Sequence, residues 1–373
     1  MKIEYGHSYC VLGAGLMGKA IAYDLLKQDD TKSVVIADSN QEQLEQASRL
    51  LNNPRLQTKV CNASDVKQIE GIFQNVTAAV AAVHYRFNEG FTRAAINTKT
   101  HLCDLGGNNT VVDAQFKLNE EAKKPGVSII PDCGLAPGMV AILVKWGLEE
   151  FNWADTVKIR VGGLPQNPTN DLKYERLFSI DGLINEYVEP VRLLRNGTLE
   201  TIEPMSELES VEFPEPFGSL EAFTTSGGVS TLVETYKNRL KNLDYKTIRY
   251  PGHCEKIKGL QKAGLFTREY FEKNLSVCEK DVTLVKIIFE GNSQKHELVL
   301  VDRATENPKH TAMMRTTAYP AAIISQMQAR GQIIKMGVFP QEQCVPVDIF
   351  IDELKKREII VHGLKKEEIL LSF

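Results

Sequence analysis

The stretch VLGAGLMGKAIAYDLL, residues 11–26, constrains the fold more than any other part of the chain. Its glycines at 13, 15 and 18 follow an apolar run over 8–12, and the last of them lies within a helical pattern over 16–28. The next apolar run, 33–38, ends on Asp38. A strand, a G-x-G-x-x-G turn, a helix and a carboxylate closing the next strand together form the fingerprint of a dinucleotide-binding unit.

Each glycine of the turn has a physical task in such a unit. Gly13 permits the tight turn, Gly15 lets the backbone approach a pyrophosphate, and Gly18 allows the helix to pack closely on the strand. The pyrophosphate then meets the N–H groups of the first helical turn, at Leu16 and Met17. The competing interpretation is a plain strand–turn–helix that binds no ligand.

Asp38 indicates which coenzyme the turn accepts. A carboxylate here accepts hydrogen bonds from the adenosine ribose and repels a 2′-phosphate. No arginine follows in Asp38-Ser39-Asn40, so NAD is favoured over NADP. A third strand over 56–60 is followed by polar residues where the adenine would lie, Asn62, Ser64 and Asp65. A local turn is an equal explanation of Asp65.

The first 135 residues continue the alternation of strands and helices. Further apolar runs predict strands at 77–83, 100–105 and 126–132, and helical patterns cover 41–51, 90–98 and 137–151. Near-continuous apolar strands separated by helices are typical of a parallel sheet covered on both faces. The sequence therefore predicts an α/β, Rossmann-type, doubly wound parallel sheet.

The pattern changes near residue 155. Residues 157–164 alternate apolar and charged side chains, which indicates a strand with one solvated face. Residues 281–305 predict a hairpin joined through Gly291-Asn292-Ser293. We expect a second, α+β domain with a mostly antiparallel sheet. Farther on, Pro320 and Gly331 mark the start and end of a helix.

Composition narrows the classes of function. Lys plus Arg is 44 and Asp plus Glu is 48, a balance that predicts neither nucleic acid nor an anionic membrane as partner. No apolar run spans a bilayer, and the first residues lack the pattern of a signal peptide. The scattered cysteines and histidines form no metal-ligand motif, so we expect no metal and reduced thiols in a cytoplasmic protein.

Polar residues cluster after three successive strands. These residues lie in the stretches VHYRFN, CDLGGNN and PDCGLAPGM. The side chains that could bind a ligand or transfer a proton are His84, Tyr85, Asn88, Asp104, Asn108 and Asp132. Ligands of open α/β sheets bind outside the carboxyl ends of the strands, so the nicotinamide half of the coenzyme should rest there, against Val83 and Gly106. Each polar residue also has a structural interpretation, as a turn cap or a satisfied internal side chain.

Several longer stretches resemble one known family. They are VLGAGLMGKAIAYDL, HYRFNEGFTRAAI, CDLGGN, IIPDCGLAPGM, VGGLPQNP, FSIDGLINEYVEPVRLLRNG, EAFTTSGGVSTL, YKTIRYPGHCEKIKGL and MMRTTAYPAAIISQM. In this order, and over nearly the whole chain, they are similar to the lysine 6-dehydrogenases of the saccharopine dehydrogenase family. The resemblance implies NAD-dependent oxidation of the side-chain amine of L-lysine to allysine, which cyclises to a piperideine carboxylate.

The resemblance also implies the domain plan. A Rossmann domain would cover 1–137, a substrate and oligomerisation domain 138–314, and a segment returning to the first domain 315–373. Relatives that reduce saccharopine-type imines carry an acidic residue in the G-L-x-P-G turn, where this chain has Ala136. We infer that Asp132, close by in sequence, supplies the missing carboxylate.

Oxidation of an amine requires a base and a residue that binds the amino-acid end of the substrate. Asp132 and Asp104 are the candidate bases, with His84 third. Arg315 is the first candidate for the substrate carboxylate, because a guanidinium matches its geometry, and Arg249 and His253 are rivals. Tyr174, Tyr187 and Thr225, with Tyr85 and Asn108 from the strand ends, are candidate pocket residues. A packing role is the alternative for each.

Two other functions compete with lysine oxidation. One is a reductase that forms a carbon–nitrogen bond, as in saccharopine or carboxynorspermidine synthesis. Asp38 and Ala136 disfavour it. The other is a non-enzymatic regulator that binds NAD, which the many polar strand ends disfavour. Oligomers are common among such enzymes, so we expect a homo-oligomer.

Overall fold

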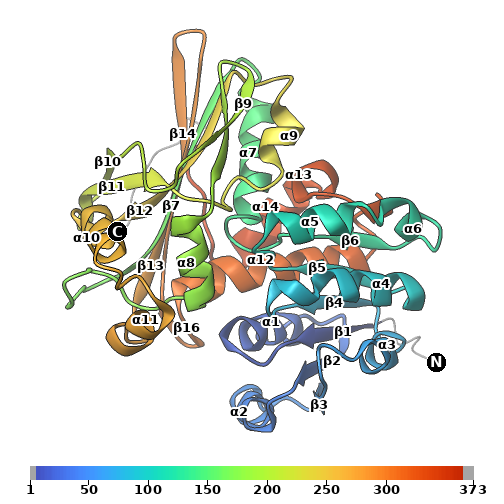
Figure 1. The fold of residues 1–373 in the computed structure, drawn as a ribbon. Coiled ribbons are helices and arrows are strands. Elements are labelled where there is room, and N and C mark those ends of the chain that lie inside the picture. The colour runs from blue at the N-terminus through green and yellow to red at the C-terminus, as the bar shows by residue number, and fades with distance from the viewer. Residues whose placement is uncertain (1–5, 364–373) are drawn as a thin grey trace. The chain divides into compact units, whose positions relative to one another are not determined.

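The structure, a computed structural model, describes residues 6–363, which divide into two compact units. Unit 1 comprises the described residues up to Ile142 together with Met314–Arg357. Unit 2 comprises Leu143–Met313 and the described residues from Glu358 onward. The chain passes from one unit to the other within helices α7 (Met139–Glu150) and α12 (Ala312–Ala329), which are labelled in Figure 1.

Unit 1 is built on a sheet of seven parallel strands in the order β17-β6-β5-β4-β1-β2-β3. The order reverses between β1 and β4, as in doubly wound sheets. The predicted Rossmann-type fold is therefore confirmed. The strands are β1 (His7–Leu12), β2 (Thr31–Asp38), β3 (Leu56–Val60), β4 (Ala78–Ala81), β5 (His101–Asp104), β6 (Ser128–Ile130) and β17 (Gly337–Val338).

Helices cover both faces of this sheet. On one face, Phe73 and Phe91 pack against strand residues such as Leu102 in a single buried cluster. On the other, α12 contacts β5 and β6 through Gln328, whose amide donates to the carbonyls of Leu102 and Ser128. The remaining helices of unit 1 are α1 (Leu16–Leu26), α2 (Gln41–Leu51), α3 (Val66–Phe73), η1 (Tyr85–Phe87), α4 (Asn88–Thr98), α5 (Asn109–Phe116), α6 (Asn119–Lys123), α13 (Gln341–Cys344) and α14 (Val347–Lys356).

A buried ion-pair network fastens the C-terminal segment to unit 1. The Arg357 guanidinium donates to both carboxylate oxygens of Asp24 on α1, at 2.7 and 2.8 Å, and to Glu353 at 2.6 Å. Burial raises the pKa of Asp24, and Arg357 opposes that shift. Buried charges need such partners, so α14 and α1 are held together.

The end of this segment departs from expectation. Residues 358–363 group with unit 2, where His362 exchanges two backbone hydrogen bonds of 2.9 Å with Val299 of strand β14 (Gln294–Arg303). The prediction that all of 315–373 returns to the first domain is therefore wrong at its end. Residues 364–373 lie outside the described residues.

Helix α12 starts eight residues before the predicted start at Pro320. The Asp281 carboxylate accepts the N–H groups of Ala312 and Met313, at 2.5 and 2.8 Å, and so provides the N-terminal cap. Pro320 lies inside the helix, where it cannot donate a backbone hydrogen bond to Thr316. The capping residue is about 30 positions away, so the local pattern did not reveal it.

Unit 2 contains a mixed sheet of eight strands, in which only the β12–β7 pair is parallel among the described pairings. The predicted hairpin is confirmed: Gly291 pairs with Gln294, and Asn292 and Ser293 both adopt positive φ. The other strands of this sheet are β7 (Thr156–Pro165), β8 (Val191–Arg195), β9 (Thr198–Ile202), β10 (Glu209–Phe213), β11 (Gly218–Thr224), β12 (Asn242–Arg249) and β13 (Asp281–Gly291). Strands β15 (Thr305–Glu306) and β16 (Lys309–His310) pair with each other in a separate two-stranded sheet. The helices are α8 (Ile180–Val188), α9 (Leu232–Tyr236), α10 (His253–Lys262) and α11 (Arg268–Asn274).

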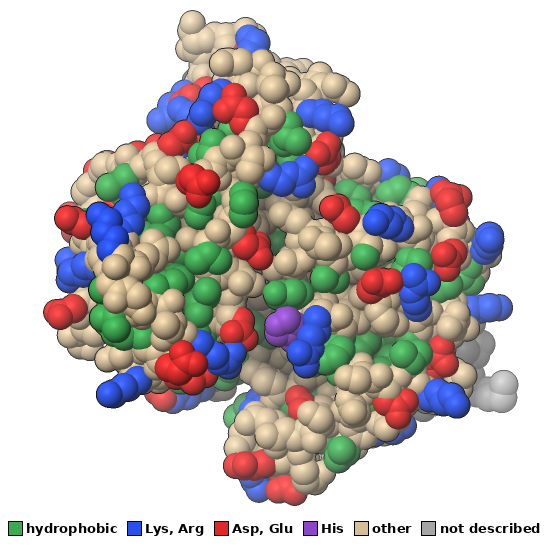
Figure 2. All heavy atoms as spheres, viewed as in Figure 1, with side chains coloured by type: hydrophobic (Ala, Val, Ile, Leu, Met, Phe, Trp, Pro, Cys, Tyr) green, Lys and Arg blue, Asp and Glu red, His purple; other side chains and the backbone are tan. Residues whose placement is uncertain are grey.

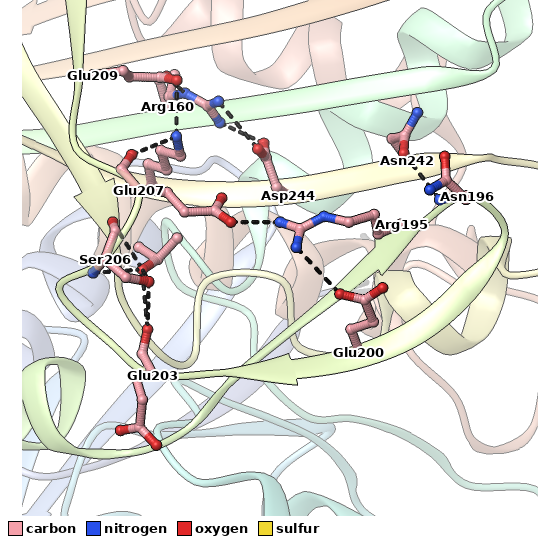
Figure 3. Close-up of polar contacts among 12 residues, drawn as sticks. Arg160, Arg195, Asn196, Glu200, Glu203, Ser206, Glu207, Glu209, Asn242 and Asp244 are labelled. Carbon is pink, nitrogen blue, oxygen red and sulfur yellow. Dashed lines mark hydrogen bonds and ion pairs between the residues drawn. The ribbon is translucent and has the colours of Figure 1, made fainter.

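The expected solvated face of β7 is instead closed by ion pairs. Arg160 is 1% exposed and contacts the carboxylates of Glu209 and Asp244, as Figure 3 shows. Arg195 of β8 pairs with Glu207 and Glu200 in the same network. The alternation of charged and apolar residues therefore predicted a polar face of β7 correctly, but the prediction that this face is exposed to solvent was wrong.

On the face seen in Figure 2, acidic and basic side chains are interspersed and neither sign gathers into a patch. Among the described residues, no helix is both long and apolar enough for a membrane span. Within the same residues, no group of three or more metal-ligating side chains comes together. All seven cysteines are buried free thiols.

The Arg357 network predicts that replacing Arg357 destabilises the protein more than replacing an exposed arginine. Replacing Arg357 with Met leaves the Asp24 carboxylate buried without its partner, which should lower the free energy of unfolding by about 3–5 kcal/mol. The control is Arg93→Met, which removes an exposed i,i+4 pair with Glu89 and should change it by about 1 kcal/mol or less. Urea unfolding followed by tryptophan fluorescence and circular dichroism measures both. Equal losses in the two variants would contradict the network's importance.

Candidate functional site

The glycine turn after β1 has the shape that a pyrophosphate requires. A Cβ on Gly18 would lie 1.9 Å from the Gly13 carbonyl oxygen, and one on Gly13 would lie 2.6 Å from that of Ala82. Around Gly15, by contrast, a Cβ would meet nothing within 4 Å. No side chain caps α1 at this residue. The open space and the first-turn N–H groups of α1 fit the charged bridge of a dinucleotide.

Asp38 links the end of β2 to the glycine turn. One carboxylate oxygen accepts the N–H of Ala14 at 2.7 Å, and the other accepts that of Asn40 at 2.8 Å. Nearby, the Lys19 ammonium donates to Gln43 and Gln46 of α2. Asp38 thus presents a fixed carboxylate at the expected position, with Ser39 beside it in the chain.

The polar residues after β3 hold their own loop. Asp65 caps α3 by accepting the N–H groups of Lys67 and Gln68 at 3.1 and 3.2 Å. The Asn62 side chain accepts the N–H of Ser64 at 2.9 Å. These hydrogen bonds correspond to the structural alternative, a capped turn.

The segment after β4 lies against the glycine turn. Val83 is 3.0 Å from a Cβ placed on Gly13, and the Tyr85 ring is 2.9 Å from one placed on Gly107. His84 is exposed and accepts the N–H of Arg86 on Nδ1 at 3.2 Å. Asn88 is buried and begins α4. The predicted adjacency of these strand ends is therefore present within unit 1.

Asp104, at the end of β5, is completely buried and binds protein donors. One oxygen accepts the N–H groups of Gly106 at 2.8 Å and Asp132 at 3.2 Å, and the other accepts the Gln115 amide at 2.8 Å. Burial raises the pKa of Asp104, and these donors oppose the shift. Asp104 is thus suited to hold the ends of β5 and β6 together.

Asp132 follows β6 with an unusual backbone. Its φ is +62°, in the left-handed region that costs a residue other than glycine about 1–3 kcal/mol. A Cβ on Gly106 would lie 1.7 Å from its Oδ1 atom, so the carboxylate rests directly on that glycine. This contact explains why the CDLGG loop needs glycine at 106. Asn108, farther along, caps α5 by accepting the N–H of Val111 at 3.2 Å.

Arg315 is a buried residue of unit 1. It is 6% exposed, donates to the Arg357 carbonyl at 3.1 Å, and lies 5.8 Å from the centre of the Tyr319 ring. These contacts belong to the packing of the C-terminal segment in unit 1.

Unit 2 brings together most of the other substrate candidates in one buried cluster. The Arg249 guanidinium donates to the Tyr187 hydroxyl at 2.9 Å and lies 4.8 Å from the centre of the Tyr174 ring. The same hydroxyl lies 3.1 Å from His253 Nε2, and His253 Nδ1 lies 2.8 Å from the Leu172 carbonyl. Thr225 is also buried, 2.7 Å from the Thr247 hydroxyl.

The hydrogen-bond directions in this cluster follow from its electrostatics. Burial and the neighbouring Arg249 charge lower the pKa of His253 to about 3, so the imidazole is neutral. Only a proton on Nδ1 can be donated to the Leu172 carbonyl, which leaves Nε2 to accept from Tyr187. Arg249, Tyr187 and His253 therefore form one directed chain.

Glu186, which the sequence did not single out, adds an acid to the cluster. Its carboxylate lies 3.5 Å from Arg249 and its side chain is 28% exposed. Burial raises its pKa to about 7, against the attraction of Arg249. Gln115 and Gln341 were also missed. Gln115 lies 11 positions from its partner Asp104, on a different element, and Gln341 lies 209 positions from Asp132, so no helix or strand periodicity indicates either contact.

Comparisons with known proteins agree with this architecture. Two family models match the chain: "Saccharopine dehydrogenase NADP binding domain" over residues 9–130 and "Saccharopine dehydrogenase C-terminal domain" over 134–360. A curated relative, the NADP⁺-dependent, L-glutamate-forming saccharopine dehydrogenase of Pyricularia oryzae, is 22% identical over 274 residues. The match covers 70% of this chain and 58% of the relative's length.

Solved structures show the same fold at low identity. Apo saccharopine dehydrogenase (L-Glu forming) of Saccharomyces cerevisiae has a TM-score of 0.78 and 16% identity over 96% of this chain and 99% of its own. Homospermidine synthase of Legionella pneumophila, in complex with NAD, has a TM-score of 0.71 and 12% identity over 98% and 94%. With the two family models covering both units, the chain belongs to the saccharopine dehydrogenase family of NAD(P)-binding oxidoreductases.

Proposed function

We propose that the protein oxidises the ε-amine of L-lysine with NAD, releasing ammonia and forming allysine, which cyclises to 1-piperideine-6-carboxylate. The observation that carries this proposal is the Asp132 carboxylate, held on Gly106 at the carboxyl ends of the parallel strands. Open α/β sheets bind their ligands at this edge. The neighbouring G-L-x-P-G turn has the uncharged Ala136, which leaves Asp132 as its nearest acid in sequence.

The first chemical requirement is a neutral amine. The side-chain amine of free lysine has a pKa of about 10.4, and only its neutral form has the nitrogen lone pair that expels a hydride from the ε-carbon. Asp132 accepts this proton and passes it to solvent. Asp104 is the weaker candidate for this role, because three N–H donors of the protein already bind it. His84, at the exposed rim, is the alternative base.

Hydride departure leaves an iminium on the substrate, and water then adds to its carbon. Asp132 takes the proton of that water, and the resulting carbinolamine releases ammonia to give the aldehyde. NAD, when bound, accepts the hydride, while the protein orients the groups and moves the protons. Each positioned proton transfer contributes roughly 10²–10⁴ in rate.

We further propose that, of the two candidate arginines, Arg249 is better suited than Arg315 to bind a carboxylate. Arg249 has an acid beside it in Glu186, so the pair offers opposite charges to a carboxylate and an ammonium. Both arginines also donate to a backbone carbonyl of their own unit, Arg249 to that of Ile248 and Arg315 to that of Arg357. Tyr174, Tyr187, Thr225 and His253 support the Arg249 cluster in this proposal.

The direct test supplies the purified protein with NAD and L-lysine, without any 2-oxo acid. NADH and ammonia should form in equal amounts.

A second candidate function, C–N bond formation by reduction, is favoured by the fold of homospermidine synthase. It predicts no reaction with lysine alone, but oxidation of NADH or NADPH when an aldehyde and an amine are supplied together. Coenzyme binding without either reaction would favour the third hypothesis, a non-enzymatic regulator that binds NAD.

Asp38 should decide coenzyme choice. Asp38→Ala removes a charged acceptor of ribose hydroxyls, a contact worth about 1.5–3 kcal/mol, so the affinity for NAD should fall roughly 10–100-fold. The affinity for NADP should not fall with it, because the repulsion of a 2′-phosphate is also lost. Fluorescence titration with NADH and NADPH measures both. The control is Asp29→Ala at an exposed aspartate, and an unchanged affinity for NADH in Asp38→Ala would remove the assignment.

Asp132 should decide turnover. Asp132→Asn keeps the shape of the side chain but removes the base, so kcat for lysine should fall by about 10²–10⁴ while the dissociation constant for NADH stays the same. The matched control is Asp113→Asn, an exposed acid on α5, which should retain full turnover. Normal turnover in Asp132→Asn would transfer the role to His84, which His84→Gln then tests.

A further inference from the structure

The C-terminal segment reaches the loop that carries Asp132. Strand β17 pairs with β6 in parallel, Gly337 with Ser128 and Val338 with Ile129, and the N–H of Phe339 then donates to the Ile129 carbonyl at 3.1 Å. The residues of each of these two strand pairs are 209 positions apart in sequence, and Gln341 and Asp132, which are hydrogen-bonded, have the same separation. A segment from the far end of the sequence thus follows β6 to its end.

Gln341 holds the Asp132 turn from one side. Its side-chain amide donates to two successive carbonyls, those of Pro131 and Asp132. The residue is 1% exposed, so the amide is fixed inside the protein. An amide has two N–H donors, which match two adjacent carbonyls, and an apolar side chain of similar size has none.

Asp104 holds the same turn from the other side. Its carboxylate accepts the N–H of Asp132 at 3.2 Å, and its backbone carbonyl accepts that of Cys133 at 2.6 Å. Both peptide groups of Asp132 are therefore bound to elements outside the turn. A left-handed backbone in a residue other than glycine persists only when its surroundings fix it in this way.

We propose that Gln341 is a positioning residue for the catalytic carboxylate of Asp132. By holding the Pro131 and Asp132 carbonyls, Gln341 keeps the backbone of Asp132 left-handed and its carboxylate directed over Gly106. This inference rests on the proposed function, in which Asp132 is the base. It makes the returning C-terminal segment part of the machinery for proton transfer.

A double-mutant cycle tests the proposal. Gln341→Leu should lower kcat for lysine about tenfold or more, with the dissociation constant for NADH unchanged. In the Asp132→Asn background the same substitution should cost less than about twofold, because the group that Gln341 positions is already gone. Equal losses in both backgrounds, or a matching loss of NADH affinity, would show a merely structural role and overturn the proposal. Gln343→Leu, at an exposed residue of the same helix, is the control.

A second readout does not depend on activity. Amide hydrogen exchange at Asp132 and Cys133 should become about tenfold faster in Gln341→Leu and stay unchanged in Gln343→Leu. Unchanged exchange in Gln341→Leu would overturn the proposal even if turnover fell. If the wild-type protein does not oxidise lysine, the proposed function fails, and the exchange still shows whether Gln341 holds the turn.

Discussion

The hydrogen bonds of one buried carboxylate join the two strand ends on which the candidate site depends. Asp104 binds the N–H of Gly106 in its own loop and that of Asp132 after the neighbouring strand. A buried carboxylate is stable only with such donors, and the donors in turn lose their freedom to move. Asp104 therefore fixes Gly106 and Asp132 relative to each other, so that the Asp132 side chain rests where any Cβ at residue 106 would collide with it.

The same principle recurs where the C-terminal segment meets unit 1. Charged and polar groups that are nearly inaccessible to water, such as Asp24, Arg357 and Gln341, bind partners far away in sequence. Loss of one partner would leave the other buried and unsatisfied, so these contacts determine where the segment lies. In our proposal this precision is functional, because the segment places Gln341 beside the turn that carries Asp132.

Much of unit 1 could be predicted from sequence because its signals are local. The glycine turn, the apolar strands and Asp38 each depend on residues within about 30 positions, and the parallel sheet follows from their alternation. Gly106 was predicted to lie against the coenzyme, and the structure shows the Asp132 side chain resting on it, a contact between two loops that no local pattern records. The roles of Asn62 and Asp65 follow the structural alternative, since short polar side chains after a strand cap turns readily.

The remaining features depend on contacts that no local pattern records. The start of α12 is set by Asp281, the burial of Arg160 by Glu209 and Asp244, and the position of Gln341 by strand pairing. Among substrate candidates, the sequence could name Arg249 but not its neighbour Glu186, whose significance comes from the 3.5 Å contact between them. Arginine residues look alike in sequence, and only their partners separate a packing role from a binding role.

A crystal structure of the protein with NADH and L-lysine bound would test the central claim most directly. The account predicts that the ε-nitrogen of lysine lies within hydrogen-bonding distance of the Asp132 carboxylate, with the nicotinamide ring beside Gly106. An ε-nitrogen directed toward another acid, with the Asp132 carboxylate still enclosed by the protein, would contradict it.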